Sequence, residues 1–208
     1  MLLVCLDLEG VLIPEIWVGV AERTGIDALH RTTRDEPDYD KLMRYRLNIL
    51  EQNNLGIREI QETIKGLDPL PGAIEFLEEL KTWAQIIILS DTFYPFGMPF
   101  MEKLGWPTLF CHDLDIGDKG EILDYKLRQE DPKRRAVEAF HKLNFSVLAS
   151  GDSYNDTSML SEADAGILFR PPENIVREFP EYPVVQNHAD LQAELKKAAG
   201  HLASPRGE

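Results

Sequence analysis

Residues 2–12 read LLVCLDLEGVL, a short apolar run that is followed at once by two acids. The run Leu2–Leu6 is too short for an ordinary helix and favours a buried strand. Two more runs of this kind, Ala84–Leu89 and Phe145–Ala149, also end in polar residues, SDT and GDSYND. Short buried strands that alternate with helical segments predict an α/β fold with a parallel sheet. Ligands of such sheets bind beyond the carboxyl ends of the strands, so we expect the three polar clusters to meet there.

Helical periodicity fills most of the sequence that follows residue 70. The turn residues GDKG (117–120) separate two extended segments and predict a β-hairpin over Leu114–Leu127. Prolines near the start of several apolar patterns mark helix beginnings. The predicted helices are Gly72–Trp83, Pro99–Leu104, Pro132–Leu143 and Ser158–Ala163.

Residues 13–69 have a different character, because amphipathic helical patterns dominate and no strand is evident. Helices are predicted over Glu15–Thr24, Tyr39–Gln52 and Ile57–Leu67. We therefore expect a core formed by residues 1–12 and 70–200, with residues 13–69 inserted after the first strand. The last residues, 201–208, have little to bury and are predicted to be a disordered tail.

Composition narrows the classes of partner. The formal net charge of −14 argues against nucleic acid and against an anionic membrane surface, because both reward Lys/Arg patches. Neither Cys5 nor Cys111 sits in a zinc-binding spacing, and nothing indicates a disulfide framework. The N-terminus lacks a basic segment of the kind that begins signal peptides, so a cytoplasmic location is expected.

Asp7 and Glu9 are the first candidates for chemistry. Two acids spaced by one residue at a strand end point the same way. One carboxylate can attack phosphorus and form an aspartyl phosphate, while the second exchanges protons with the leaving and accepting oxygens. On its own, this pair also suits a solvated turn.

Two further residues suit the binding of a phosphoryl group. Ser90, at the end of a predicted strand, can donate a hydrogen bond to a phosphoryl oxygen, although it also suits a helix N-cap. Lys133 lies in the first turn of a predicted helix, where a cation is unfavourable for the helix dipole. That placement suggests a second task, which is to hold Asp7 and neutralise a transferring phosphoryl group.

Asp152 and Asp156, in the string GDSYND, complete the set. Acids four residues apart after a buried strand suit a hard cation, with Asp152 as a ligand and Asp156 as a ligand or its support. If all the clusters converge, four carboxylates repel one another at short range. Lys133 and a divalent cation would relieve that repulsion, and Mg2+ is the ion expected.

These residues, in this order, resemble the haloacid dehalogenase superfamily, and the insert resembles the cap of its phosphoserine phosphatase branch. The resemblance implies a Rossmann-like parallel sheet core with a small helical cap. It implies Asp7 as nucleophile, Glu9 as general acid/base, and Mg2+ held by Asp7, Asp152 and the backbone carbonyl of Glu9. It also implies substrate contacts from Glu15, Arg46, Ser90, Asp91, Lys133 and Asn155.

Two departures from the usual pattern point to a narrower group. The family usually has DxD where this chain has Asp7-Leu8-Glu9, and a glycine pair where this chain has Asp91-Thr92. Strings such as DLEGVL, TRDEPDYD, ILSDTFY, LRQEDPKR, GDSYNDTSMLSEA and REFPEYP resemble the bifunctional phosphoserine phosphatase/homoserine phosphotransferases, which implies a role in serine and threonine biosynthesis.

The expected function is therefore Mg2+-dependent hydrolysis of phosphoserine, with transfer of the phosphoryl group to homoserine as a second outcome. Two alternatives remain open at this point: a phosphatase of another small phosphomonoester, and a family member that binds a ligand without catalysis. The expected partners are small molecules, with no nucleic acid and no membrane. A homodimer is also open, although no residues indicate it.

Overall fold

The computed structural model of the chain describes residues 1–32, 35–36 and 38–203. Its centre is a seven-stranded sheet in the order β4-β3-β2-β1-β5-β6-β7. All neighbouring strands are parallel except β3 and β4, which form the predicted hairpin. The α/β prediction is therefore confirmed. The strands are β1 Leu2–Leu6, β2 Gln85–Phe93, β3 Thr108–Ile116, β4 Ile122–Lys126, β5 Ser146–Gly151, β6 Ala165–Phe169 and β7 Val184–Val185.

The central strands are apolar on both faces because helices cover both sides. In β1, Val4 and Leu6 belong to one buried cluster, while Leu3 and Cys5 belong to another on the opposite face. This alternation follows from the two-residue period of a strand. Continuous apolar runs such as LLVCL are typical of parallel sheets buried on both faces.

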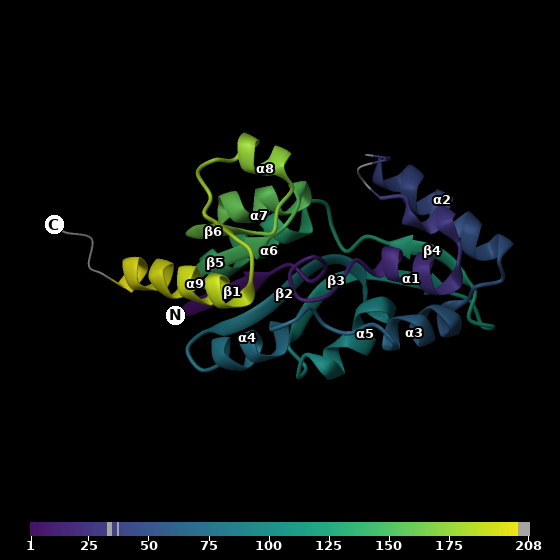
Figure 1. Cartoon of the computed structure of the whole chain (residues 1–208), viewed down its shortest axis with the longest axis horizontal. Helices are drawn as coiled ribbons and strands as arrows, with labels where there is room; N and C mark the ends of the chain where they lie inside the picture. The colour runs from purple at the N-terminus through teal and green to yellow at the C-terminus, as the bar shows by residue number, and fades with distance from the viewer. Residues whose placement is uncertain (33–34, 37, 204–208) are drawn as a thin grey trace.

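Two layers of helices sandwich the sheet. In Figure 1, α4 and α5 lie below the sheet while α6 and α7 lie above it. The helices outside the insert are α4 Ala73–Leu80, α5 Tyr94–Lys103, α6 Pro132–Lys142, α7 Thr157–Glu162, α8 Glu173–Glu178 and α9 His188–Ala203, with a short 3-10 helix, η2, over Tyr154–Asp156. Among the residues described, no helix is long and apolar enough to cross a membrane.

Residues 13–69, called the insert below, form α1 Ile16–Thr24, η1 Asp27–His30, α2 Tyr39–Gln52 and α3 Ile57–Lys65. The three predicted helices of this segment are confirmed to within two residues at each end. Figure 1 shows them beyond the ends of β1 and β2, where α2 lies beside β4 and α3 beside α5. The insert is thus placed over the carboxyl ends of the strands.

The structure corrects the predicted start of α5 and the predicted start of the C-terminal tail. Helix α5 begins at Tyr94 rather than Pro99, because Pro95 suits the first turn and the helix continues through Pro99. Pro99 has no N–H to give the Pro95 carbonyl, which instead accepts a hydrogen bond from Gln61 Nε2 of α3 at 2.9 Å. At the other boundary, helix α9 includes residues 201–203 of the predicted disordered tail, since Leu191 and Leu195 anchor that helix in the core. Residues 204–208 lie outside the described part.

His188 joins the two points where the chain leaves and re-enters the core. Its Nε2 lies 2.8 Å from the Val11 carbonyl, just before the insert, and its Nδ1 lies 3.0 Å from the Pro71 carbonyl, just after it. The ring is buried between Phe76 and Phe169, at centroid distances of 5.4 and 4.8 Å. A neutral imidazole donates to one of these carbonyls and a protonated one donates to both. His188 therefore fixes the base of the insert.

A His188→Leu variant should lower the free energy of unfolding by about 1–3 kcal/mol, because it leaves a buried carbonyl without a donor. Urea unfolding of the purified protein measures this change. His30→Leu is the matched control, because the His30 ring is exposed and lies near one carbonyl of its own short helix. The control should change stability by no more than about 0.5 kcal/mol. Equal stability of the two variants would contradict the role given to His188.

Candidate active site

A cavity of about 550 Å3 opens beyond the carboxyl ends of β1, β2 and β5, where the predicted polar clusters meet. All the predicted site residues line it except Asp156, which is completely buried. The lining includes Asp7, Glu9, Glu15, Arg46, Ser90, Asp91, Lys133, Asp152 and Asn155. The topology therefore brings together residues that are widely separated in the sequence.

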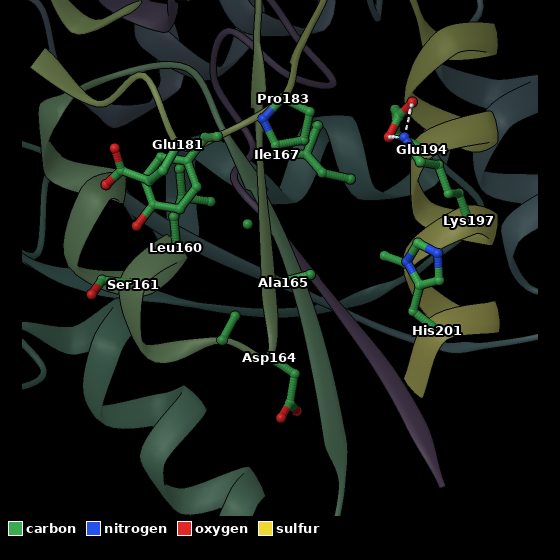
Figure 2. A pocket seen from close by; sticks show the side chains of 14 residues that line it. Leu160, Ser161, Asp164, Ala165, Ile167, Glu181, Pro183, Glu194, Lys197 and His201 are labelled. Atoms are coloured by element: carbon green, nitrogen blue, oxygen red, sulfur yellow. Dashed lines mark hydrogen bonds and ion pairs between the residues drawn. The ribbon is translucent and has the colours of Figure 1, made fainter. Parts of the chain in front are cut away.

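A smaller cavity of about 390 Å3 lies between α7, β6 and α9, and Figure 2 shows it. It adjoins Asp164 and Ala165, at the amino end of β6, and therefore lies away from the carboxyl ends of the strands. Two of its charged side chains, Glu194 and Lys197, pair with each other at 3.1 Å (Figure 2). Of these two cavities, only the larger is lined by the predicted site residues.

The side chain of Lys133 occupies the centre of the site. Its Nζ lies 2.8 Å from Asp7 Oδ1, 2.6 Å from Asp156 Oδ1 and 3.3 Å from Asp91 Oδ2. The side chain is only 2% exposed. Burial alone would lower the pKa of Lys133, but the three carboxylates hold it well above its usual value. Lys133 therefore stays an ammonium group that donates hydrogen bonds to Asp7 and Asp156 and forms an ion pair with Asp91.

Asp156 orients the loop that carries Asp152. Its Oδ2 accepts hydrogen bonds from the backbone N–H groups of Asp152 at 3.0 Å and Ser153 at 3.1 Å. Gly151 allows this fold of the loop, because a Cβ at that position would lie 2.3 Å from the Cβ of Asp156. Asp156 is thus already held by Lys133 and by backbone donors, which suits a supporting group better than a freely available ligand.

Oxygens of Asp7, Asp152 and Asp156 lie within 4.8 Å of one another. Burial, followed by repulsion from Asp156, raises the pKa of both Asp7 and Asp152, in the latter case to about 7. Gly10 lies so close that a Cβ there would be 2.4 Å from Asp152 Oδ2. The local carboxylates outnumber the single ammonium of Lys133, so this donor set of hard oxygens fits a divalent cation such as Mg2+.

Glu9 reaches from the core to the insert. Its Oε2 accepts a hydrogen bond from the backbone N–H of Ile16, the first residue of α1, at 2.8 Å. Burial, and then the charge of Glu15, raises the pKa of Glu9 to about 7. A carboxyl group with that pKa can give and take a proton near neutral pH.

Arg46 is a buried cation at the insert side of the cavity. Its guanidinium lies over the ring of Trp17, 4.6 Å from the centroid, and its Nη2 donates to the Arg31 carbonyl at 2.9 Å. Burial lowers its pKa to about 10, so the group remains charged at neutral pH. Its buried Nε has no hydrogen-bond partner in the described part of the chain. Glu15, at the start of α1, is exposed and also lines the cavity.

Asp91, in β2, contacts His112 of β3 and Asn155 of η2. Its Oδ2 accepts a hydrogen bond from Asn155 Nδ2 at 2.7 Å, and its Oδ1 lies 3.6 Å from His112 Nε2. Burial would raise the pKa of Asp91, but Lys133, followed by His112 and Asn155, holds it well below its usual range. Beside it, the buried Ser90 Oγ accepts a hydrogen bond from the Thr92 N–H at 3.2 Å.

Trp17, Tyr39 and His112 are among the residues that line this cavity and that the sequence analysis missed. His112 was overlooked because the predicted hairpin began at Leu114, so the first half of β3 was not identified as a strand. Its signal would have been the short apolar run Leu109–Cys111, which directly precedes His112. Trp17 and Tyr39 sit in helical patterns, where aromatic residues usually indicate only packing.

Comparisons with known proteins point to one family. A model of the haloacid dehalogenase-like hydrolase family matches residues 1–164. The chain is 57% identical over 200 residues to phosphoserine phosphatase ThrH of Pseudomonas aeruginosa, covering 96% of this chain and 98% of that protein. It is 54% identical over 195 residues to a phosphoserine phosphatase of Pseudomonas syringae pv. tomato, covering 94% and 82% of the two chains.

The fold also matches solved structures. A substrate-bound phosphoserine phosphatase complex aligns with a TM-score of 0.77 and 24% identity, over 94% of this chain and 97% of that one. A phospho-aspartyl intermediate analogue of phosphoserine phosphatase gives a TM-score of 0.76, also at 24% identity, with the same coverage of both chains. At this level of identity the structures establish the fold only. The family model over residues 1–164 and the 57% identity to the Pseudomonas aeruginosa protein show that the chain belongs to the haloacid dehalogenase-like hydrolase family.

Proposed function

We propose that the protein is a Mg2+-dependent phosphoserine phosphatase that forms a phosphoryl group on Asp7 and also transfers it to homoserine. The observation that carries the proposal is the buried ammonium of Lys133, 2.8 Å from Asp7 in a cavity that Arg46 also lines. The part of the cavity around Lys133 and Asp7 suits a phosphoryl group, and the part around Arg46 suits a carboxylate. The names of the two Pseudomonas relatives support phosphoserine as the donor, and the name ThrH supports a link to threonine metabolism.

In the first step, the carboxylate of Asp7 attacks phosphorus and the bond from phosphorus to the serine oxygen breaks. Glu9 gives its proton to that oxygen, a role that suits its pKa of about 7. Lys133 holds Asp7 in place and offsets the negative charge of the transferring group, to which Ser90 can donate its hydroxyl. Serine leaves, and the phosphoryl group remains on Asp7.

In the second step, Glu9 takes the proton of an incoming hydroxyl group, whose oxygen attacks phosphorus. The bond to Asp7 breaks, and the carboxylate is regenerated. Water as the acceptor yields inorganic phosphate, whereas homoserine yields phosphohomoserine. Because serine and homoserine carry the same ammonium and carboxylate groups, one site with Glu15 and Arg46 can bind both.

The residues that would hold Mg2+ are Asp7, Asp152 and the backbone carbonyl of Glu9, with Asp156 supporting the loop of Asp152. When bound there, the ion would withdraw charge from the phosphoryl oxygens. We further propose that residues 13–69 form a cap over a core of residues 1–12 and 70–200, and that the cap limits access of water to the phosphorylated Asp7. The free, buried thiols of Cys5 and Cys111 are consistent with action in the reducing cytoplasm.

The test is turnover of L-phosphoserine with Mg2+, with and without L-homoserine, while inorganic phosphate and phosphohomoserine are both measured. We expect phosphohomoserine to appear at the expense of inorganic phosphate, because both products come from one phosphorylated enzyme. Phosphate release that homoserine leaves unchanged would reject the transfer activity. No turnover of phosphoserine would reject the assignment of the donor.

Arg46→Ala should lower kcat/KM for phosphoserine by about 10- to 100-fold, because a charged hydrogen bond to the substrate carboxylate is lost. Turnover of p-nitrophenyl phosphate, which has no amino-acid groups, should change by no more than about threefold. Glu15→Ala should show the same selectivity, through the substrate ammonium group.

Arg44→Ala is the matched control for Arg46→Ala. Arg44 lies on the same helix, but it is half exposed and pairs with Asp124 at 2.8 Å, outside the cavity lining. The control should retain phosphoserine kinetics close to the wild type. Arg46 does not bind the substrate carboxylate if Arg44→Ala and Arg46→Ala lower kcat/KM for phosphoserine equally. The same conclusion follows if Arg46→Ala affects phosphoserine and p-nitrophenyl phosphate alike.

A further inference from the structure

Asp91 is the least buried of the three carboxylates that surround Lys133. Lys133 has three carboxylate partners, and two of them are almost completely buried: the side chains of Asp7 and Asp156 are 6% and 0% exposed. Asp91 is the third, and its side chain is 28% exposed and lines the cavity. Of the three, Asp91 therefore has the most room to turn away from Lys133.

Two other side chains, those of Asn155 and His112, contact Asp91, and substrate binding should affect the two contacts differently. Asn155 donates to Asp91 Oδ2 at 2.7 Å, but it is exposed and is one of the residues expected to contact substrate. An amide that turns towards the substrate gives up this contact. His112 has a side chain that is only 4% exposed, and its Nε2 faces Asp91 Oδ1 at 3.6 Å. This separation is longer than an ordinary hydrogen bond, so the contact is mainly electrostatic.

The orientation of His112 is set from its other side. Its Nδ1 accepts a hydrogen bond from the backbone N–H of Arg128 at 3.0 Å. A nitrogen that accepts cannot carry the ring proton, so the proton lies on Nε2 and points towards Asp91. Phe93 packs near the same ring, at a centroid distance of 6.3 Å. The imidazole is thus fixed in both tautomer and direction.

We propose that His112 is a positioning residue for the phosphoryl transfer assigned above: it acts through Asp91 to keep the ammonium of Lys133 directed at the reacting centre. This role rests on the proposed function and adds a residue to it. The contact is made in the enzyme before and during reaction, and it persists when Asn155 turns to substrate. Loss of the His112 donor should therefore slow the chemical step more than it weakens substrate binding.

The experiment compares two substitutions of His112 whose side chains differ in length, so that only the longer one can place an N–H at the Nε2 position. His112→Asn can still accept from Arg128 at the Nδ1 position, but it has no donor at the Nε2 position. His112→Gln can place an amide N–H where Nε2 lies. We expect kcat for phosphoserine to fall about 10-fold or more in His112→Asn, with KM changed by no more than about twofold, and His112→Gln to recover most of the loss.

A double-mutant cycle tests whether His112 acts through Asp91. In an Asp91→Asn background, His112→Asn should lower kcat no further. His141→Asn is the matched control, because His141 also faces a carboxylate, Asp164, at 3.2 Å but lies outside the cavity lining. Thermal unfolding of each variant separates lost activity from lost stability. The proposal is overturned if His112→Asn and His112→Gln are equally active. It is also overturned if the effects of His112→Asn and Asp91→Asn on kcat are additive.

Two readouts keep this proposal distinct from the proposed function. Lys133 acts on the phosphoryl group that all substrates share, so the loss in His112→Asn should also appear with p-nitrophenyl phosphate. If the protein turns over p-nitrophenyl phosphate but not phosphoserine, the result therefore rejects only phosphoserine as the substrate, and the role of His112 can still be tested. Independently of activity, 15N NMR of the wild-type protein should show the His112 proton on Nε2, and a proton on Nδ1 would overturn the proposal.

Discussion

The ammonium group of Lys133 is the interaction on which the site depends. It is buried among three carboxylates, those of Asp7 directly after β1, Asp91 in β2 and Asp156 in η2. Removing it would leave these charges unpaired in a region of low dielectric, which is strongly unfavourable. Lys133 sits in the first turn of α6, where the helix dipole disfavours a cation, and the surrounding carboxylates outweigh that cost. The sheet order brings the segments that carry these carboxylates close to one ammonium group.

The close packing of these carboxylates accounts for two nearby features, the glycines at positions 10 and 151 and the raised pKa values of Asp7 and Asp152. Glycines stand at positions 10 and 151 because side chains there would collide with Asp152 and Asp156. The pKa values of Asp7 and Asp152 are raised in the protein alone, so a divalent cation would bind favourably by restoring their charge. Glu9, whose pKa is raised to about 7 by burial and by Glu15, reaches from the core to the first residue of α1.

The sequence alone predicted the parts of the fold that have strong local signals. The runs that form β1, β2 and β5 end in polar residues, and the order of those clusters along the chain indicated that Asp7, Glu9, Ser90, Lys133 and Asp152 share one site. The short β7 was not predicted, because Val184–Val185 is too brief to show a pattern. His112 was missed for another reason: its role depends on the Arg128 N–H and on Asp91, which come close to it only through the fold.

The most direct test is to find the phosphoryl group in the protein. After brief mixing with phosphoserine and Mg2+, an acid quench and digestion allow mass spectrometry to locate it. The account predicts an acid-stable, alkali-labile phosphoryl group on the peptide that contains Asp7, and its absence in Asp7→Asn and after removal of Mg2+ with EDTA. A phosphoryl group on any other residue, or equal labelling of Asp7→Asn, would contradict the account.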